Sequence, residues 1–320
     1  MTEVFTKPFE GVGVDVTGLN NGERRKAADL SWDAIAQPTQ TYNPVTFEPM
    51  DLPGNRVVMR NDGKGGIDGT GILGYVGNRY TIVQPKAAFD FADILDREGE
   101  VDIETMGHFG GGSTMWVLAR VPEGAFEAKP GDEVVPYFLF RNSFDGSSGV
   151  VGGLVSTRVV CWNTLAHATK EAKGSAVGFN LRHTASVEDK LEAARKAIAR
   201  AAQAHKEFGT FAQRLAQAGM SSAQWSDFSL ALVPDPVKEG ASNAKADNIR
   251  GRMTELFLSG RGNQGKTAWD ALNAVTEWAN YAASARNQES RLKSLWFGAN
   301  GKRATNAVSL LTDFANVTGQ

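Results

Sequence analysis

Four strand-like runs, joined by short polar links, dominate the middle of this 320-residue chain. Each run is rich in β-branched and aromatic residues, and their ranges are 101–109, 114–121, 134–141 and 149–160. Glycines at 110–112 join the first two runs, and residues 144–148 join the last two. Because links this short connect neighbouring antiparallel strands, the pattern predicts a β-meander.

After Trp162 the apolar spacing changes from every second residue to a helical period. Residues 163–173 are expected to form a short helix, and residues 179–183 a last short strand. Ser186 and Asp189 match a capping box, which marks the start of a helix running to Ala218. Apolar residues in this helix recur at steps of three and four, so one side must lie against another layer. We expect that layer to be the meander, which makes an α+β fold.

The flanking regions differ from this core. Residues 1–55 contain five prolines and little periodicity, which predicts an extended arm with one short helix near 23–30. A hairpin over 72–83 and a helix over 86–97 are expected next. Residues 221–320 have helical periodicity, with helices expected near 243–258 and 267–284. We therefore divide the chain into an N-terminal arm (1–55), an α+β core (56–220) and a helical C-terminal region (221–320).

Composition excludes some classes of protein. No apolar run approaches the roughly 20 residues of a membrane-spanning helix, and the N-terminus lacks a secretion pattern. The single cysteine, Cys161, excludes an internal disulfide, so we expect a soluble protein of a reducing cytoplasm.

Charge is unevenly distributed. Residues 1–150 carry 13 Lys and Arg against 22 Asp and Glu, whereas residues 151–220 and 241–303 each carry 10 against 5. The two basic segments match either a polyanion site or ordinary solvated helix faces.

Residues 260–267 match the phosphate-loop pattern G-x-x-x-x-G-K-[ST]. The amide of Gly265 would help cradle phosphates, Lys266 would reach the terminal phosphates, and Thr267 would hold magnesium. However, residues 248–258 have a helical pattern, whereas such a loop follows a buried strand. The alternative is a glycine-rich link between two helices, with Thr267 capping the second.

No group of residues indicates catalysis. Cys161 has His167 and His183 nearby in sequence, but it ends an apolar strand, where a free cysteine is usually a core residue. The four histidines lack the paired spacing of a zinc site. We expect no catalytic residue, metal or cofactor.

Cations, an amide and an aromatic ring are concentrated around the end of the meander, as single-stranded nucleic acid requires. The candidate binding residues are Arg141, Arg158, Trp162, Asn163, Lys170, Lys173, Arg182 and His183. Arg141 precedes a polar loop, 142–148, which could present amides to a phosphate or could be a plain hairpin turn. Trp162 is the candidate stacking platform, or alternatively a core residue among solvated cations.

Several of these segments occur together in a known family. In chain order they are Arg79–Gln84 (RYTIVQ), Met115–Arg120 (MWVLAR), Asn142–Ser148 (NSFDGSS), Arg158–Leu165 (RVVCWNTL), Arg182–Thr184 (RHT) and Ala268–Glu277 (AWDALNAVTE). They resemble the phage- and plasmid-like proteins that carry the DUF932 domain, over about residues 55–300. The family's usual Trp-His-Gly-Leu-Gly opening is not visible here. The resemblance implies a mobile-element protein in a bacterial host cytoplasm, and its element order is similar to Rad52-like single-strand annealing proteins.

The leading hypothesis is a phage recombination protein that binds and anneals single-stranded DNA, without ATP and as a homo-oligomer. A host or phage single-strand-binding protein is a further expected partner. One alternative is a nucleotide-dependent enzyme that uses residues 260–267. The other is a non-catalytic protein that binds a host protein through its acidic half.

Overall fold

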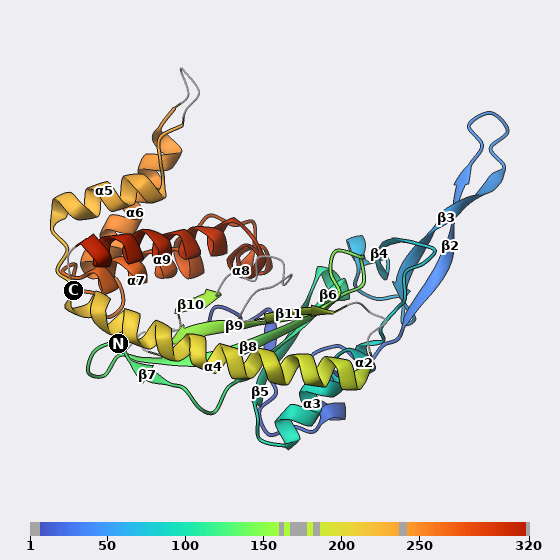
Figure 1. Ribbon diagram of the computed structural model, residues 1–320. Coiled ribbons are helices and arrows are strands. Elements are labelled where there is room, and N and C mark those ends of the chain that lie inside the picture. Colours follow the sequence, from blue (N-terminus) through green and yellow to red (C-terminus); the bar gives the residue numbers. More distant parts are fainter. Residues whose placement is uncertain (1–6, 160–162, 167–177, 182–185, 237–241, 318–320) are drawn as a thin grey trace.

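The predicted meander forms the centre of an antiparallel sheet in the computed structural model, which describes residues 7–159, 163–166, 178–181, 186–236 and 242–317 (Figure 1). Its four strands lie side by side in chain order: β5 (Asp102–Phe109), β6 (Thr114–Arg120), β8 (Glu133–Ser143) and β9 (Val150–Arg158). All pairs in this sheet are antiparallel, so the meander is confirmed.

Four short strands extend this sheet. β1 (Gly13–Asp15) pairs with β5, and β7 (Phe126–Glu127) pairs with β8. β10 (Asn163–Ala166) and β11 (Gly178–Leu181) pair with successive halves of β9, on the side away from β8. The helix expected over 163–173 is therefore wrong for its first four residues, and the others lie outside the described residues. Pairing with β9 provides the backbone hydrogen bonds that a helix would otherwise have provided.

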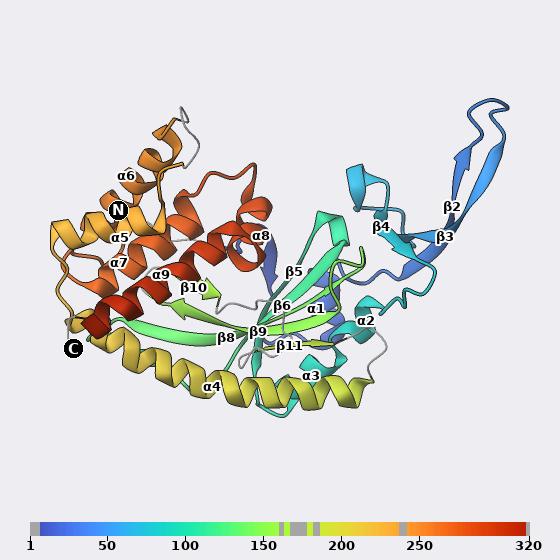
Figure 2. The same ribbon diagram turned by 45° about the horizontal axis from the view of Figure 1, so that its top comes forward.

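A long helix, α4 (Val187–Gln217), packs under this sheet, as predicted (Figure 2). The Ser186 hydroxyl accepts a hydrogen bond from the amide of Asp189, and the Asp189 carboxylate accepts one from the amide of Ser186, which confirms the capping box. Ala194, Ala197 and Ile198 of α4 join Phe138 and Leu154 of the sheet in one core. The α+β class is thus confirmed.

The N-terminal region contains a second sheet. α1 (Asn21–Ala27) precedes β2 (Ala34–Tyr42) and β3 (Pro49–Arg60), and β3 pairs with β4 (Ile72–Gly77). β2 and β3 run out from the body as a two-stranded ribbon (Figures 1 and 2). The predicted boundary at residue 55 falls inside β3.

The hairpin expected over 72–83 is wrong. After β4, residues 79–84 are not a strand, and the partner of β4 is β3. Tyr80 donates its hydroxyl hydrogen to the carbonyl of Ser143, which holds this segment against the first sheet. The helix expected over 86–97 is present as two pieces, α2 (Pro85–Ala88) and α3 (Asp90–Arg97), with a non-helical residue, Phe89, between them.

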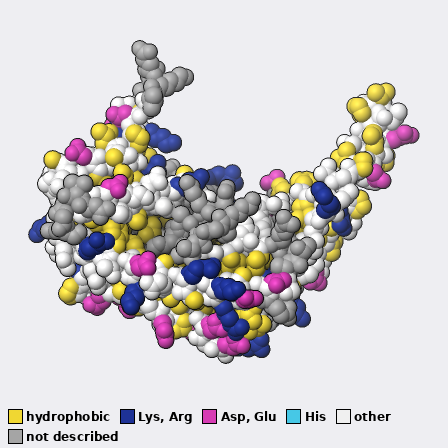
Figure 3. All heavy atoms as spheres, in the orientation of Figure 1, with side chains coloured by type: hydrophobic (Ala, Val, Ile, Leu, Met, Phe, Trp, Pro, Cys, Tyr) yellow, Lys and Arg dark blue, Asp and Glu magenta, His cyan; other side chains and the backbone are white. Residues whose placement is uncertain are grey.

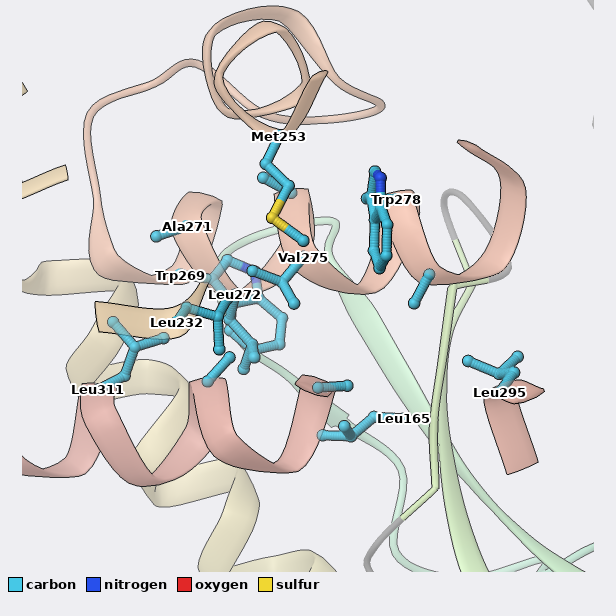
Figure 4. Packing of buried hydrophobic residues seen from close by; sticks show 14 of the residues in the cluster. Leu165, Leu232, Met253, Trp269, Ala271, Leu272, Val275, Trp278, Leu295 and Leu311 are labelled. Atoms are coloured by element: carbon cyan, nitrogen blue, oxygen red, sulfur yellow. The ribbon is translucent and has the colours of Figure 1, made fainter. Parts of the chain in front are cut away.

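The C-terminal region is helical, as predicted. Its elements are α5 (Ser222–Leu232), α6 (Ala244–Ser259), α7 (Ala268–Glu277) with a π-helical turn at Trp278–Ala282, α8 (Gln288–Phe297) and α9 (Ala299–Val317). Trp269 and Leu272 of α7 pack with Leu311 of α9 and near Leu165 of β10 (Figure 4). This region therefore shares one apolar core with the sheet. No helix in the described part of the chain is long and apolar enough to span a membrane.

Candidate nucleic-acid interface

The upper face of the large sheet, opposite α3 and α4, is turned toward a hollow in the outline of the molecule, which lies between the C-terminal helices and the ribbon (Figures 2 and 3). Gly107, Trp116, Arg141 and Val151 are direct neighbours on four adjacent strands. Direct neighbours in antiparallel strands point to the same face, so these residues form one row across the sheet. Figure 3 shows Lys and Arg side chains along the rim of the hollow beside the C-terminal helices.

Trp116 anchors one end of this row. Its side chain is fully buried, and a Cβ placed on Gly13 or Gly107 would lie only 2.3 or 2.6 Å from its ring. The indole therefore lies directly over the backbone of β1 and β5. Its other side meets Trp296 of α8 edge-on, with 4.9 Å between ring centroids. These contacts fix α8 at the edge of the sheet face.

Arg141 is held next to that anchor. Its guanidinium lies 4.1 Å from the ring centroid of Phe297, at the end of α8. The side chain is partly buried, and desolvation lowers its pKa, an effect that the charge of Asp145 only partly offsets. Its Nε has no hydrogen-bond partner, and it forms no ion pair with a carboxylate of the described residues. Arg141 is thus a partly buried cation without a counter-charge in direct contact.

Arg158 has the opposite surroundings. It is 3% exposed, and it donates to both carboxylate oxygens of Asp132, at 2.5 and 2.6 Å. Trp269 also donates to Asp132, and Arg158 reaches the carbonyl of Arg261 at 2.9 Å. The guanidinium is therefore occupied in joining β9 to the C-terminal region, which does not fit the expected phosphate contact. Arg158 lies in a strand that is buried on both faces. The sequence carries no signal of this burial, so it could not distinguish Arg158 from Arg141.

Of the other predicted binding residues, Asn163 alone lies in the part of the chain that the structure describes. Trp162, Lys170, Lys173, Arg182 and His183 lie outside the described residues, as does Cys161. Asn163 begins β10, where its backbone pairs with Arg158. The chain leaves the described part at Ala166, beside Val155, and re-enters it at Gly178, beside Gly153. Both ends of the segment that carries Lys170 and Lys173 are therefore fixed on β9, the strand next to that of Arg141.

A cationic stretch, residues 286–303, covers α8 and the start of α9, and it was recognised in the sequence only as part of the basic segment 241–303. It contains one acid, Glu289, and five cations: Arg286, Arg291, Lys293, Lys302 and Arg303. Glu289 accepts from the amide of Gly110 and from Lys293, at 2.8 and 2.9 Å.

Arg303 has an environment like that of Arg141. Its guanidinium lies 5.0 Å from the ring centroid of Trp278, and burial lowers its pKa. It forms no ion pair within the described part of the chain. Arg141 and Arg303 are thus both held against aromatic rings and have charge to offer an anion.

The phosphate-loop pattern at 260–267 does not form a phosphate cradle. It follows a helix, α6, rather than a strand. Glu277 accepts from the amide of Arg261, and Asp270 accepts from the amides of Lys266 and Thr267. Thr267 caps α7, so Gly265, Lys266 and Thr267 belong to a link between helices. The amides of Arg261, Lys266 and Thr267 and the hydroxyl of Thr267 are therefore already bonded within the protein.

One serine–histidine pair lies elsewhere in the core. The Ser156 hydroxyl is 2.9 Å from Nδ1 of His205, and burial lowers the pKa of this histidine to about 4. Ser156 is 3% exposed and His205 is 0% exposed, so neither group is accessible to a substrate. Within the described residues, no cluster of His, Cys, Asp and Glu has the geometry of a metal site.

Fold and site together define an α+β protein whose large sheet has helices below it and a cation-lined hollow above it. Residues 72–296 match the model of the family described as a domain of unknown function, DUF932, and the chain belongs to that family. No curated protein and no solved structure matches the chain. The matched segment begins at β4, so it includes the large-sheet meander and α4 to α8 but leaves out the β2–β3 ribbon.

Proposed function

We propose that this protein binds single-stranded DNA across the upper sheet face and anneals complementary strands in phage or plasmid recombination, without ATP and as an oligomer. The observation that carries the proposal is Arg141, a partly buried cation of the upper sheet face that has no carboxylate partner among the described residues. The expected phage or host single-strand-binding protein would be a further partner of this activity.

The surroundings of Arg141 suit a phosphate. Burying a cation without a counter-charge is unfavourable, so an anion that binds there regains electrostatic free energy. Stacking on Phe297 fixes the plane of the guanidinium and leaves its N–H edge to bind phosphate oxygens. Arg303, which lies over the ring of Trp278, and the other cations of residues 286–303 add positive charge to the helices that pack on the sheet. A backbone of repeating phosphates matches such a row of cations better than a single small anion does.

Annealing also fits the chemistry that the described residues offer. Pairing two strands breaks and forms no covalent bond, so it requires positioning of the strands rather than a nucleophile or a general base. The nucleotide-dependent alternative has less support, because the amides of residues 261, 266 and 267 already donate to carboxylates. The meander with a helix packed across it also resembles, in element order, the Rad52-like annealing proteins, which is a fold-level analogy.

Replacing Arg141 tests the proposal directly. We expect Arg141→Ala to weaken binding of a labelled oligothymidylate by about tenfold, and to reduce the slope of log affinity against log salt by about one. Fluorescence anisotropy at about 50 and about 200 mM salt measures both quantities. ATP and magnesium should not alter the binding.

The matched control is Arg252→Ala. It removes an exposed cation of α6 that forms an ion pair with Glu255 of the same helix. It should bind the oligonucleotide like the wild type. Equal losses in both variants would indicate unspecific charge attraction and contradict the site. Absence of binding at low salt, or binding that requires ATP, would reject the proposal itself.

A further inference from the structure

The end of the β2–β3 ribbon, residues 37–55, exposes an unusual amount of apolar surface. Val45 is 81% exposed, Phe47 is 76% exposed and Tyr42 is 69% exposed, and Met50 and Leu52 are exposed beside them. An isolated two-stranded ribbon is at best marginally stable in water. Exposed apolar groups gathered at one place usually mark a contact with another molecule. We therefore expect another protein surface to cover the end of the ribbon.

The chemistry of the ribbon limits how it can be covered. Pro38, Pro49 and Pro53 interrupt its strands and remove amide donors, which disfavours the addition of another strand at its edges. Within residues 37–55, the only charged residues are Glu48 and Asp51. The partner surface should thus accept apolar side chains and carry some positive charge.

A groove between α5 and α6 has these properties. Trp225 and Phe257, stacked with 4.3 Å between their centroids, contribute to its lining, and its volume is about 540 Å³. Leu230 and Leu258 also line it, and they are 47% and 59% exposed. They are the only large apolar side chains exposed beyond residue 75 in the described part of the chain.

Charge and position also favour this pairing. α6 carries Lys245 on its exposed surface, and this cation suits Glu48 and Asp51 of the ribbon. The groove and the ribbon lie at opposite ends of the molecule (Figure 1). A chain therefore cannot cover its own groove with its own ribbon, but a second copy can.

We propose that the ribbon of one copy docks in the α5–α6 groove of the next copy, which assembles the protein head to tail. Such a heterologous contact uses two different surfaces, so each added copy leaves one ribbon and one groove open until the assembly closes. This contact would form the oligomer that the proposed function requires, and to that extent the inference rests on the proposed function. Its test uses molecular mass without nucleic acid, so its failure would leave the DNA-binding result standing.

The test compares Phe47→Ser in the ribbon with Leu258→Ser in the groove, using light scattering after size exclusion over a range of concentrations. We expect the wild type to assemble, and each variant to weaken assembly by about tenfold or more, because each removes a central apolar contact. Ile67→Ser, which removes another exposed apolar side chain outside both surfaces, should assemble like the wild type. Equal melting temperatures would show that the variants remain folded.

Mixing the two variants gives the sharper result. Phe47→Ser keeps a normal groove and Leu258→Ser keeps a normal ribbon, so the mixture should form a dimer with one copy of each and stop there. A wild type that stays monomeric, a Leu258→Ser variant that assembles normally, or a mixture that stays monomeric would each overturn the proposal. A disulfide between copies of a Cys161→Ser, Phe47→Cys, Leu258→Cys protein would support it independently.

Discussion

Arg141 and Arg158 lie on neighbouring strands of one sheet, and their immediate surroundings give them opposite properties. Arg158 is enclosed with Asp132, whereas Arg141 stacks on Phe297 and has no carboxylate in contact among the described residues. The sequence places both at the ends of apolar strands and cannot distinguish them. The difference depends on Asp132, which lies in a turn 26 residues before Arg158. Nothing in the spacing of that turn predicts the contact.

The pair of Asp132 and Arg158 should be important for stability. Asp132→Asn keeps the shape of the side chain but leaves the buried guanidinium without its counter-charge. Breaking a buried ion pair in this way costs roughly 3–5 kcal/mol. Urea denaturation should therefore show a large loss in the free energy of unfolding.

The comparison variant is Glu192→Gln, which breaks an exposed ion pair with Lys196 on α4. Surface pairs of this kind contribute little, so its unfolding midpoint should not change measurably. Equal midpoints for Asp132→Asn and the wild type would contradict the structural role of the buried pair.

At the scale of elements, strongly periodic segments were predictable and irregular ones were not. The meander strands and α4 have clear periods, and each is present close to its predicted range. The β2–β3 ribbon was expected only as an extended arm, because its outer half buries no face and so has no alternation. The segment 163–166 pairs with β9, a tertiary contact that local pattern does not reveal. At the candidate site, the sequence placed Arg141 among the candidate residues but gave no sign of the aromatic rings that contact Arg141 and Arg303.

Glycines at close contacts give a test of element packing. A Cβ on Gly107 would meet the Trp116 ring at 2.6 Å and the carbonyl of Val12 at 2.7 Å. Gly107→Ala should force β1 and the indole apart, and overpacking of this kind costs roughly 1–3 kcal/mol. Thermal denaturation should show a lower midpoint.

The same substitution at Gly251 is the control. Gly251 lies within α6, and no atom comes within 4 Å of an added Cβ. Gly251→Ala should raise stability by roughly 0.5–1 kcal/mol, because alanine favours the helix. The two substitutions should change the free energy of unfolding in opposite directions. A change in the same direction would argue against the described packing of Trp116.

At the scale of the whole molecule, the C-terminal helices and the sheet form one unit. Leu118 and Tyr137 of the sheet belong to the same apolar cluster as Trp269, Leu295 and Trp296. Composition and periodicity indicated a helical region after residue 220, but they cannot show whether such a region has its own core. The shared cluster answers that question for the described residues: the region completes the core of the sheet.

This shared core predicts a single unfolding transition. Calorimetry of the full chain should show one peak, with the calorimetric and van't Hoff enthalpies equal. A chain ending at residue 220 should lose this cooperative transition, because apolar groups on the upper sheet face and at the end of α4 would be exposed. Two separate peaks, or a well-folded fragment 1–220, would contradict this view.

The register shift between Pro38 and Gln40 has a consequence for the size of a head-to-tail assembly. A β-bulge bends the strand that contains it, and this one lies where the ribbon leaves the small sheet. In a closed ring of such copies, the number of subunits is a full turn divided by the rotation that relates one copy to the next. In such a ring, the bulge would help to set the rotation between neighbouring copies. Removing one residue there should therefore change the number of subunits, and with it the diameter of the ring, rather than the strength of the contacts between copies.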